Sequence, residues 1–486
     1  MRWIAVYCPR LALDRLTRSQ ADPQPLALCD RTQVRLANAA AQALGIQAGM
    51  RRATAQALCA GLHIIEQAPR EEAEALEQIA LWLLQFTPTV SLEPPSGLLL
   101  EVEASLRLFG GLDRLESRIR AGLSALGFEC RLASAPTAGA AWMLVRGHRE
   151  DGARIAQNTG LAAGLGPLRV GLLQAAAPHL DALTAIGVRC VGDLARLPRA
   201  GLARRWGPAL LDELDAALGR RPCVRACIAA PERFSLSLGL LAQVEQAQAL
   251  LFAGQRLLTH WTGWLAARTA GAQEVWLEAL HESGRHAQPP TRLCLKLAEP
   301  SRETERWVGV LREQLARTRL PAPVHTLRLS GEASTRLAGH AGELFPRPGS
   351  EAEDLGRLIE RLQARLGPER VQRLCLAADH RPEAAYRIEP LDPRAPSPAL
   401  PLPALPRPLW LLPEPVPLSE RAQGPWWEGP LTLIAGPERI ETGWWDERVV
   451  ARDYFIAETG SAHWLWIFRT RLSHSEGGWF LQGLFA

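Results

Sequence analysis

The chain has 486 residues, which is more than one hydrophobic core usually supports, so we expect several domains. Its nine cysteines are scattered without a Cys-x-x-Cys pair, which argues against zinc and against a disulfide framework and suits a reducing cytoplasm. The net charge of +4 is only mildly basic. No apolar run is long enough for a membrane span or a signal sequence, so we expect a cytoplasmic protein without membrane partners, metal or other cofactor.

The first region, residues 1–160, is predicted to mix strands and helices. Apolar runs at 3–7 and 97–102 indicate strands that are buried on both faces. Helices are expected at 33–44, 52–60, 71–85 and 112–126. These elements would suit any α+β domain, so the order of sequence motifs must decide the fold class.

The next two regions have different patterns. Residues 161–228 are predicted to be helical with glycine breaks, and 180–194 read as helix, short turn and helix. Residues 232–337 alternate as strand, helix, strand, strand, helix and strand, with the elements expected at 234–240, 244–269, 275–281, 291–297, 302–318 and 324–330. This βαββαβ pattern has many unrelated uses and does not define a function alone.

The C-terminal part divides into three regions. Residues 338–387 contain one amphipathic helix, 353–366, and a charged turn in which His380 is expected to be surface decoration. Residues 388–424 are predicted to be a proline-rich extended linker, most evidently over 391–417. Residues 425–486 are rich in aromatic side chains, and their alternation indicates a small antiparallel sheet.

Several short motifs occur in a characteristic order. They lie at 45–50, 53–59, 86–88, 98–101, 108–111, 134–137, 186–188 and 194–198. In order and spacing they resemble the Y-family DNA polymerases, most closely their polymerase-like members in bacterial mutagenesis cassettes. The resemblance implies an α+β multidomain protein: palm and fingers over 1–160, a helix-hairpin-helix thumb over 161–228, a βαββαβ little finger over 232–337, a helical extension over 338–387 and a small aromatic-rich β module at the C-terminus.

The metal ligands of active relatives are missing. Phosphoryl transfer to a primer end uses two divalent ions, which need carboxylate ligands at fixed positions. The resemblance places the first ligand at Tyr7 and the other two at Ser96 and Gly97, and none of these residues is acidic. We therefore expect no catalytic residue and no metal site.

The nucleotide pocket is altered as well. The resemblance places the residues that hold the triphosphate at Ala39 and Gln42, the bulky residue that excludes ribonucleotides near Ala12, and a phosphate-binding lysine near Ala138. Lys296 is the only lysine in the chain, so no other lysine can replace the missing one in the palm. Two alternatives stay open. Either Glu93, Glu101, Glu103 or Asp14 supplies substitute ligands in a divergent active polymerase, or the protein is a scaffold that does not bind DNA.

The predicted thumb is the candidate DNA-binding site. Free N–H groups at the turn, with Gly187, Val188, Arg189 and Gly192, could bind a backbone phosphate. Arginines downstream could add phosphate contacts that do not read sequence; they are Arg199, Arg204, Arg205, Arg220 and Arg221. We expect primed or damaged DNA as the ligand.

Two further sets of residues are candidate protein-binding sites. In the resembled proteins a peptide between core and tail binds the sliding clamp in an extended conformation. One candidate for this peptide lacks the usual glutamine and consists of Arg407, Leu409, Trp410 and Leu412. A second candidate has the glutamine and consists of Gln423, Trp426 and Trp427. The tail aromatics Trp426, Trp427, Trp444 and Trp445 are candidate partner contacts. The resemblance implies two further partners, the RecA-like ImuA and an error-prone C-family polymerase. It also implies that this protein is the non-catalytic hub of an SOS-type translesion complex.

Overall fold

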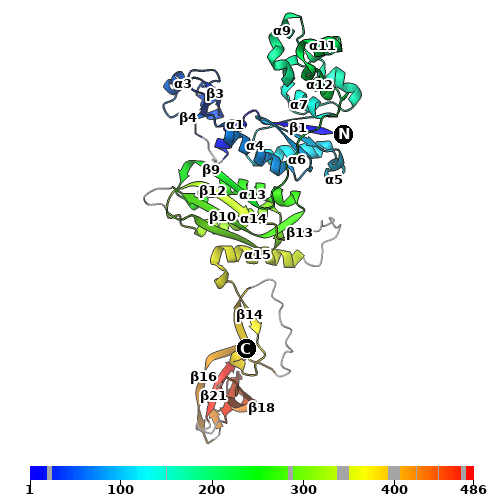
Figure 1. The fold of residues 1–486 in the computed structure, drawn as a ribbon. Helices are drawn as coiled ribbons and strands as arrows, with labels where there is room; N and C mark the ends of the chain where they lie inside the picture. The colour runs from blue at the N-terminus through cyan, green and yellow to red at the C-terminus, as the bar shows by residue number, and fades with distance from the viewer. Residues whose placement is uncertain are drawn as a thin grey trace. The chain divides into compact units, whose positions relative to one another are not determined.

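The computed structural model forms two compact units, Met1–Arg365 and Leu366–Ala486, each described by itself below (Figure 1). It describes residues 1–18, 24–148, 150–282, 288–336, 350–391, 406–422, 424–446, 448–471 and 478–485. Within these ranges no helix has the length and apolar character needed to span a membrane.

The palm is a five-stranded sheet in the order β5-β6-β1-β7-β8, with β1 antiparallel to both of its neighbours. The expected central strands at 3–7 and 97–102 are both present. Ile4 and Val6 face the core on the side of α4 and α6, whereas Ala5 faces the core on the side of α7. The bounds are β1 Trp3–Tyr7, α1 Leu11–Thr17, α4 Pro69–Leu83, β5 Val90–Glu93, β6 Gly97–Glu101, α5 Leu106–Phe109, α6 Leu112–Ala125, β7 Arg131–Ala135, α7 Ala138–Gly147 and β8 Ala153–Arg154.

The fingers form a separate three-stranded sheet in the order β3-β2-β4. The helix predicted at 33–44 is wrong in its first half, because Val34–Ala37 is strand β3 and pairs with β2. Asn38 then accepts the N–H of Ala41 and so begins helix α2. The bounds are β2 Leu26–Cys29, β3 Val34–Ala37, α2 Ala39–Ala43, α3 Arg52–Leu58 and β4 His63–Glu66.

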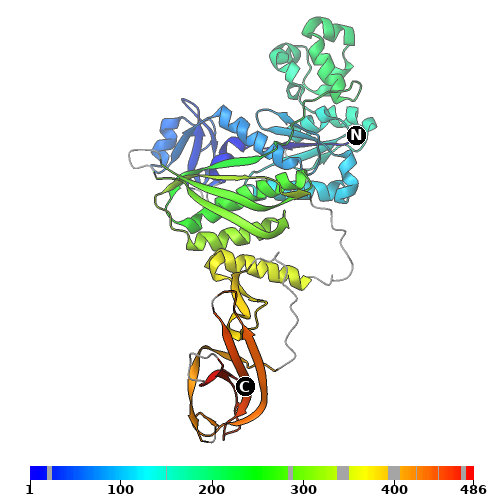
Figure 2. The same cartoon turned by 60° about the horizontal axis from the view of Figure 1, so that its bottom comes forward.

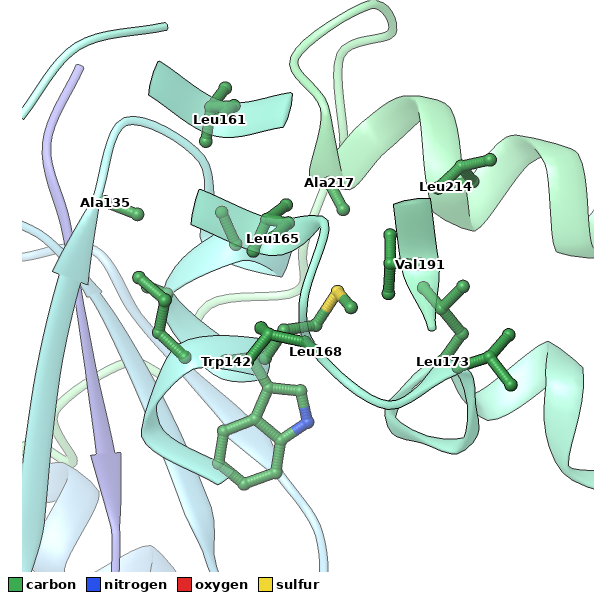
Figure 3. Close-up of a cluster of buried hydrophobic side chains, with 14 of the residues drawn as sticks. Ala135, Trp142, Leu161, Leu165, Leu168, Leu173, Val191, Leu214 and Ala217 are labelled. Atoms are coloured by element: carbon green, nitrogen blue, oxygen red, sulfur yellow. The ribbon is translucent and has the colours of Figure 1, made fainter. Parts of the chain in front are cut away.

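The thumb shares its hydrophobic core with the palm. Figure 3 shows Trp142 of α7 beside apolar side chains of the thumb, among them Leu168 and Leu173. Gly139 of α7 permits this close packing, because a Cβ there would lie 3.3 Å from the Cβ of Ala217. The thumb helices are α8 Leu161–Leu165, α9 Leu180–Ala185, α10 Val191–Arg196, α11 Arg199–Trp206 and α12 Pro208–Ala217.

The little finger has an antiparallel sheet in the order β11-β10-β12-β9, and all six predicted elements are present. Its helix α13 packs against the palm, where the indole of Trp82 fits between Gly122 and Gly263. A Cβ on either glycine would come within 2.4 Å of that ring. The bounds are β9 Phe234–Val244, α13 Leu250–Ala267, β10 Ala270–His281, β11 Thr291–Ser301, α14 Thr304–Arg317, β12 Val324–Gly331, β13 Thr335–Arg336 and α15 Ser350–Leu366.

The second unit contains a hairpin and a curved six-stranded antiparallel sheet in the order β17-β16-β21-β20-β19-β18 (Figure 2). The predicted linker is wrong over its last part, because Trp410–Arg421 is strand β16 of this sheet. The prolines at 413, 415 and 417 alternate, so they remove donors from one edge of the strand only. The bounds are β14 Gln372–Leu376, β15 Tyr386–Pro390, β16 Trp410–Arg421, β17 Gly424–Trp426, β18 Thr432–Thr442, β19 Val450–Glu458, β20 Trp464–Thr470 and β21 Trp479–Leu484.

Candidate polymerase centre and nucleic-acid interface

The three residues at the ligand positions lie together at one end of the palm sheet. Tyr7 ends β1 and is paired with Gly97, which begins β6. The N–H of Cys8 donates to the carbonyl oxygen of Ser96 at 2.9 Å. The geometry therefore brings Tyr7, Ser96 and Gly97 to a common place, but it brings no carboxylate with them.

Trp142 fills the space beside Gly97. A Cβ built on Gly97 would lie 2.1 Å from Cη2 and 2.4 Å from Cζ3 of Trp142, so no side chain fits at this position while the indole stays there. The rings of Trp142 and Tyr7 meet edge to face, with centroids 5.8 Å apart. We did not predict Trp142 as a site residue. The sequence signal for this contact is a tryptophan directly after four small residues, 138–141, together with a glycine at position 97.

The surroundings of this centre are cationic. The guanidinium carbon of Arg131 lies 5.1 Å from the Tyr7 ring centroid, and that of Arg146 lies 5.3 Å from the Trp142 ring. Positive charge at this distance disfavours a divalent cation. Among the described residues, no three His, Cys, Asp or Glu side chains are placed to hold a metal ion together. The residues of this centre therefore do not fit the two-metal arrangement.

The substitute carboxylates do not converge on the centre. Glu93 is nearest, because it pairs with Gly97 across the β5-β6 hairpin, but it forms an ion pair with Arg225. Glu101 lies at the other end of β6, where it accepts the N–H of Glu103 at 3.2 Å. Of Glu93, Glu101 and Glu103, only Glu93 lies at the same end of the palm sheet as Tyr7 and Gly97.

Asp14, the fourth substitute carboxylate, has a structural role in α1. It is buried and accepts the N–H of Glu129 at 2.9 Å. Burial raises the pKa of its carboxyl to about 6, although the Glu129 hydrogen bond and the nearby Arg10 lower it. A carboxylate that is held in this way is engaged by the loop after α6 and not by the polymerase centre.

The positions that hold the triphosphate in active relatives carry neutral side chains in the fingers. Ala39 begins α2 and is exposed. The Nε2 atom of Gln42 donates to the carbonyl oxygen of Ala37 at 2.9 Å, so its amide is engaged by the end of strand β3. Neither side chain offers a charge to an anion.

The thumb turn has the predicted helix, turn and helix, with Gly187 in the left-handed region at φ +86°. The expectation that its N–H groups are free is wrong, because these groups already donate within the protein. The N–H groups of Arg189 and Cys190 both donate to Asp193 Oδ2, which caps α10. The remaining N–H groups donate to backbone carbonyl oxygens: Gly187 to Thr184, Val188 to Leu183, Val191 to Leu168 and Gly192 to Gly166.

The thumb arginines divide into paired and unpaired groups. Arg199 and Arg220 form ion pairs with Asp215, and Arg221 pairs with Asp212. Arg204 and Arg205 are exposed on α11 and form no ion pair in the described part of the chain. These two side chains therefore keep their charge available for an anionic ligand.

The outer face of the little-finger sheet offers little free charge. Lys296 pairs with Glu274 at 3.2 Å, while Arg292 pairs with Glu278 at 2.9 Å. Trp276 lies on the same strand as these two glutamates and is partly exposed. A duplex could contact this face, but these cations are already paired with carboxylates, and Arg292 and Arg328 share Glu278.

The first clamp-peptide candidate lies at the start of β16. Leu409 and Trp410 are 74% and 70% exposed. Arg407 donates to Glu438 Oε2 at 2.8 Å, and Leu412 packs against the core of the module. The peptide is therefore fixed at both ends, with its two apolar side chains protruding between them. Gln423, in the second candidate, lies outside the described residues.

The four tail tryptophans differ in exposure. Trp426 and Trp427 are half-buried, whereas Trp444 and Trp445 are exposed and meet edge to face with centroids 4.8 Å apart. Their loop is held by Arg381, a buried side chain that pairs with both Asp379 and Asp446. The charged turn that contains His380, itself exposed as expected, thus anchors the loop of the exposed tryptophan pair.

The β14-β15 hairpin carries an apolar face that we did not predict. Leu374 is opposite Ile388 and Leu376 is opposite Tyr386, and all four side chains are exposed. Two strands alone are marginally stable in water, so an apolar face on a hairpin is a candidate contact surface. The alternation at 374, 376, 386 and 388 was the available sequence signal.

Comparisons with known proteins agree with the motif order. Residues 12–146 match the impB/mucB/samB family. Curated ImuB proteins from two strains of Caulobacter vibrioides are each 29% identical over 475 residues, covering 91% of this chain and 100% of the relative. Among solved structures, a Dbh ternary complex has 16% identity and a TM-score of 0.39, covering 68% of this chain and 99% of that chain. DinB from Sulfolobus solfataricus has 15% identity and a TM-score of 0.37, with coverages of 68% and 99%. The similarity to ImuB over nearly the whole chain, together with the impB/mucB/samB match, confirms the resemblance predicted from the sequence and the Y-family type of fold.

Proposed function

We propose that this protein is a non-catalytic polymerase homologue that binds DNA and the sliding clamp and serves as the hub of an SOS-type error-prone translesion complex. The observation that carries the non-catalytic part is the contact between Trp142 and Gly97. A ligand carboxylate at position 97 has no space, and Tyr7 offers a phenol where the first carboxylate would be. Primer extension with magnesium or manganese tests this part, and we expect no extension.

The competing hypothesis is a divergent polymerase that uses Glu93. The ion pair between Glu93 and Arg225 argues against it, because that carboxylate is already neutralised. Template-dependent extension that disappears in Glu93→Ala would favour the divergent polymerase and refute the non-catalytic hub.

Binding to the DNA backbone is the second part of the proposal. Because the N–H groups of the thumb turn are engaged, we assign the phosphate contacts to Arg204 and Arg205. Contacts with phosphate release counterions and do not depend on sequence. The variant Arg204→Ala with Arg205→Ala should weaken binding to primed DNA of any sequence. It should lower the slope of log affinity against log salt by roughly one to two units.

The matched control replaces Arg220 and Arg221 with alanine in the same thumb. Their guanidinium groups are held by Asp215 and Asp212, so the slope should change by less than about one unit. If the wild type and both double variants show the same slope of log affinity against log salt, Arg204 and Arg205 do not contact the DNA backbone. A wild-type affinity that does not depend on salt would favour the DNA-independent scaffold instead.

Protein recruitment is the third part. Leu409 and Trp410 have the exposed apolar side chains that a clamp pocket would receive. Trp444 and Trp445, on a loop fixed by Arg381, are suited to a partner's hot spot. We propose ImuA and an error-prone C-family polymerase as the partners of this module, with the exposed hairpin face as an additional contact surface.

A further inference from the structure

Three basic side chains, two of them buried and one half-buried, lie where the palm meets the little finger. We call Arg18, Arg256 and His260 the buried basic cluster. Arg18 follows helix α1 and is 6% exposed, and His260 of α13 is 4% exposed. Arg256 lies one helical turn before His260, so both project from the same face of α13. The cluster therefore joins two subdomains of the first unit.

Among the residues that the structure describes, the two guanidinium groups of the cluster have no carboxylate partner. The nearby acids are used elsewhere, because Glu71 pairs with Arg15 and Glu129 pairs with Arg10. Asp14 accepts the backbone N–H of Glu129. In the described part of the chain, Arg18 has a neutral partner, Gln78 Oε1 at 2.9 Å, and Arg256 has none among the acids.

Both arginines are still charged at neutral pH. Burial, with Arg256 and Arg15 as smaller causes, lowers the pKa of Arg18 to about 10. Burial alone lowers the pKa of Arg256 to about 10. The pKa of His260 is lowered well below its usual value, first by burial and then by Arg18, so its ring is neutral. Two positive charges, on the buried Arg18 and the half-buried Arg256, thus lie close together with no counter-charge from the described residues.

Several nitrogen atoms of the cluster also lack a hydrogen-bond partner among the described residues. The buried nitrogen atoms without a hydrogen-bond partner include Arg18 Nε, Arg256 Nε and Nη1, and His260 Nε2. An unpaired buried charge is strongly unfavourable, and each unsatisfied buried donor adds to that penalty. Water can satisfy an N–H group, but it cannot neutralise two guanidinium charges. The chemistry missing from this place is a small anion with several acceptor oxygens.

The backbone at Gly127 packs closely against both arginines. Gly127 has φ +84°, and a Cβ there would lie 2.7 Å from the Cβ of Arg18 and 2.9 Å from Nε of Arg256. The same geometry shows that the two arginines approach one point from the palm and from α13. Aromatic rings flank them, with Arg256 over Phe252 at 4.0 Å and Arg18 over Phe128 at 4.8 Å.

We propose that the buried basic cluster binds a phosphate group and thereby fixes the little finger to the palm. Two guanidinium forks and an imidazole suit a tetrahedral divalent oxyanion. The burial of Arg18 excludes a DNA backbone, so the phosphate belongs to a small molecule, either free phosphate or the end of a diphosphate. This site is separate from the thumb arginines and does not depend on the proposed function.

The test is thermal unfolding of the full chain in inorganic phosphate and in chloride at equal ionic strength. Phosphate should raise the Tm of the wild type saturably, by roughly 2 °C for each tenfold increase above its dissociation constant. Arg256→Met keeps the aliphatic stem and removes the charge. It should melt at or above the wild-type temperature in chloride and lose the response to phosphate. Pyrophosphate that acts at lower concentration than phosphate would identify a diphosphate ligand, and the reverse order would identify free phosphate.

The matched control is Arg306→Met in the same subdomain, because Arg306 is also largely buried but pairs with Glu360. It should lower the Tm and keep the phosphate response. Phosphate also stabilises proteins by general exclusion from their surfaces, which would raise wild type and Arg256→Met equally. Equal responses would overturn the proposal. If Arg256→Met does not fold, Arg18→Gln and calorimetric titration of the wild type decide, and the absence of a binding isotherm would also overturn it.

Discussion

Adding one methyl group at Gly97 should destabilise this protein only while Trp142 is present. The new Cβ of Gly97→Ala would lie 2.1 Å from Trp142 Cη2, whereas carbon atoms pack at about 3.5–4.0 Å. Either the indole or strand β6 must therefore move by roughly 1.5 Å within a close-packed core, and overpacking of this kind costs about 1–3 kcal/mol. Trp142→Ala alone should cost about 3–5 kcal/mol through the cavity that it leaves.

The double variant distinguishes this contact from general damage. With the indole removed, the methyl group added at position 97 has space, so we expect the double variant to be about 1–3 kcal/mol more stable than the sum of the single effects predicts. The assay is urea unfolding followed by circular dichroism, with Gly201→Ala as control. Gly201 lies in α11 with nothing within 4 Å of its added Cβ, so that change should be neutral or stabilising by up to about 1 kcal/mol. Additive single effects, or a neutral Gly97→Ala, would refute the assignment of Trp142 as the group that fills the ligand position.

Two further predictions concern the clamp peptide and a buried acid. The double variant Leu409→Ala, Trp410→Ala should lose clamp binding in a pull-down, by about 2 kcal/mol for each side chain, while its DNA affinity is unchanged. If this variant and the double variant Trp426→Ala, Trp427→Ala both still bind the clamp, neither peptide is the clamp ligand. The folded pKa of Asp14 is raised to about 6, so its protonated form is favoured by folding and stability should fall as the pH rises from about 4 through 6. Asp14→Asn keeps an oxygen for the Glu129 N–H and should remove this dependence, which unfolding at pH 4 and pH 8 would measure; an unchanged pH dependence would show that Asp14 does not cause it.

Much of the fold could be predicted because periodicity and motif order agree. The six elements of the little finger follow from alternation and helical spacing, and the helix-turn-helix of the thumb follows from Gly187. The errors have a common physical origin. Val34–Ala37 and Trp410–Arg421 are strands because neighbouring chain segments pair with them, and sequence-local patterns do not show that pairing.

The site was predicted less completely, because its chemistry depends on contacts between distant segments. The sequence showed that Tyr7 and Gly97 lack carboxylates, but not that Trp142 occupies the space. It showed the thumb arginines, but not that three of them form ion pairs with Asp215 and Asp212. Of the N–H groups expected to be free at the turn, that of Arg189 donates to the helix-capping residue Asp193, and those of Gly187, Val188 and Gly192 donate to backbone carbonyl groups.

The aromatic filling of the polymerase centre has a structural consequence beyond the loss of metal ligands. A cluster of carboxylates in an active palm is held together against its own repulsion. Here Tyr7 and Trp142 pack edge to face at that place, and α7, which carries Trp142, also carries Gly139 against Ala217 of the thumb. One short helix therefore packs against both the Tyr7 and Gly97 end of the palm sheet and the thumb. Carboxylates placed at positions 7, 96 and 97 while Trp142 remains would remove this packing and lie beside Arg131 and Arg146, which would compete with a metal ion for them, so we expect that these substitutions alone would not create a metal site.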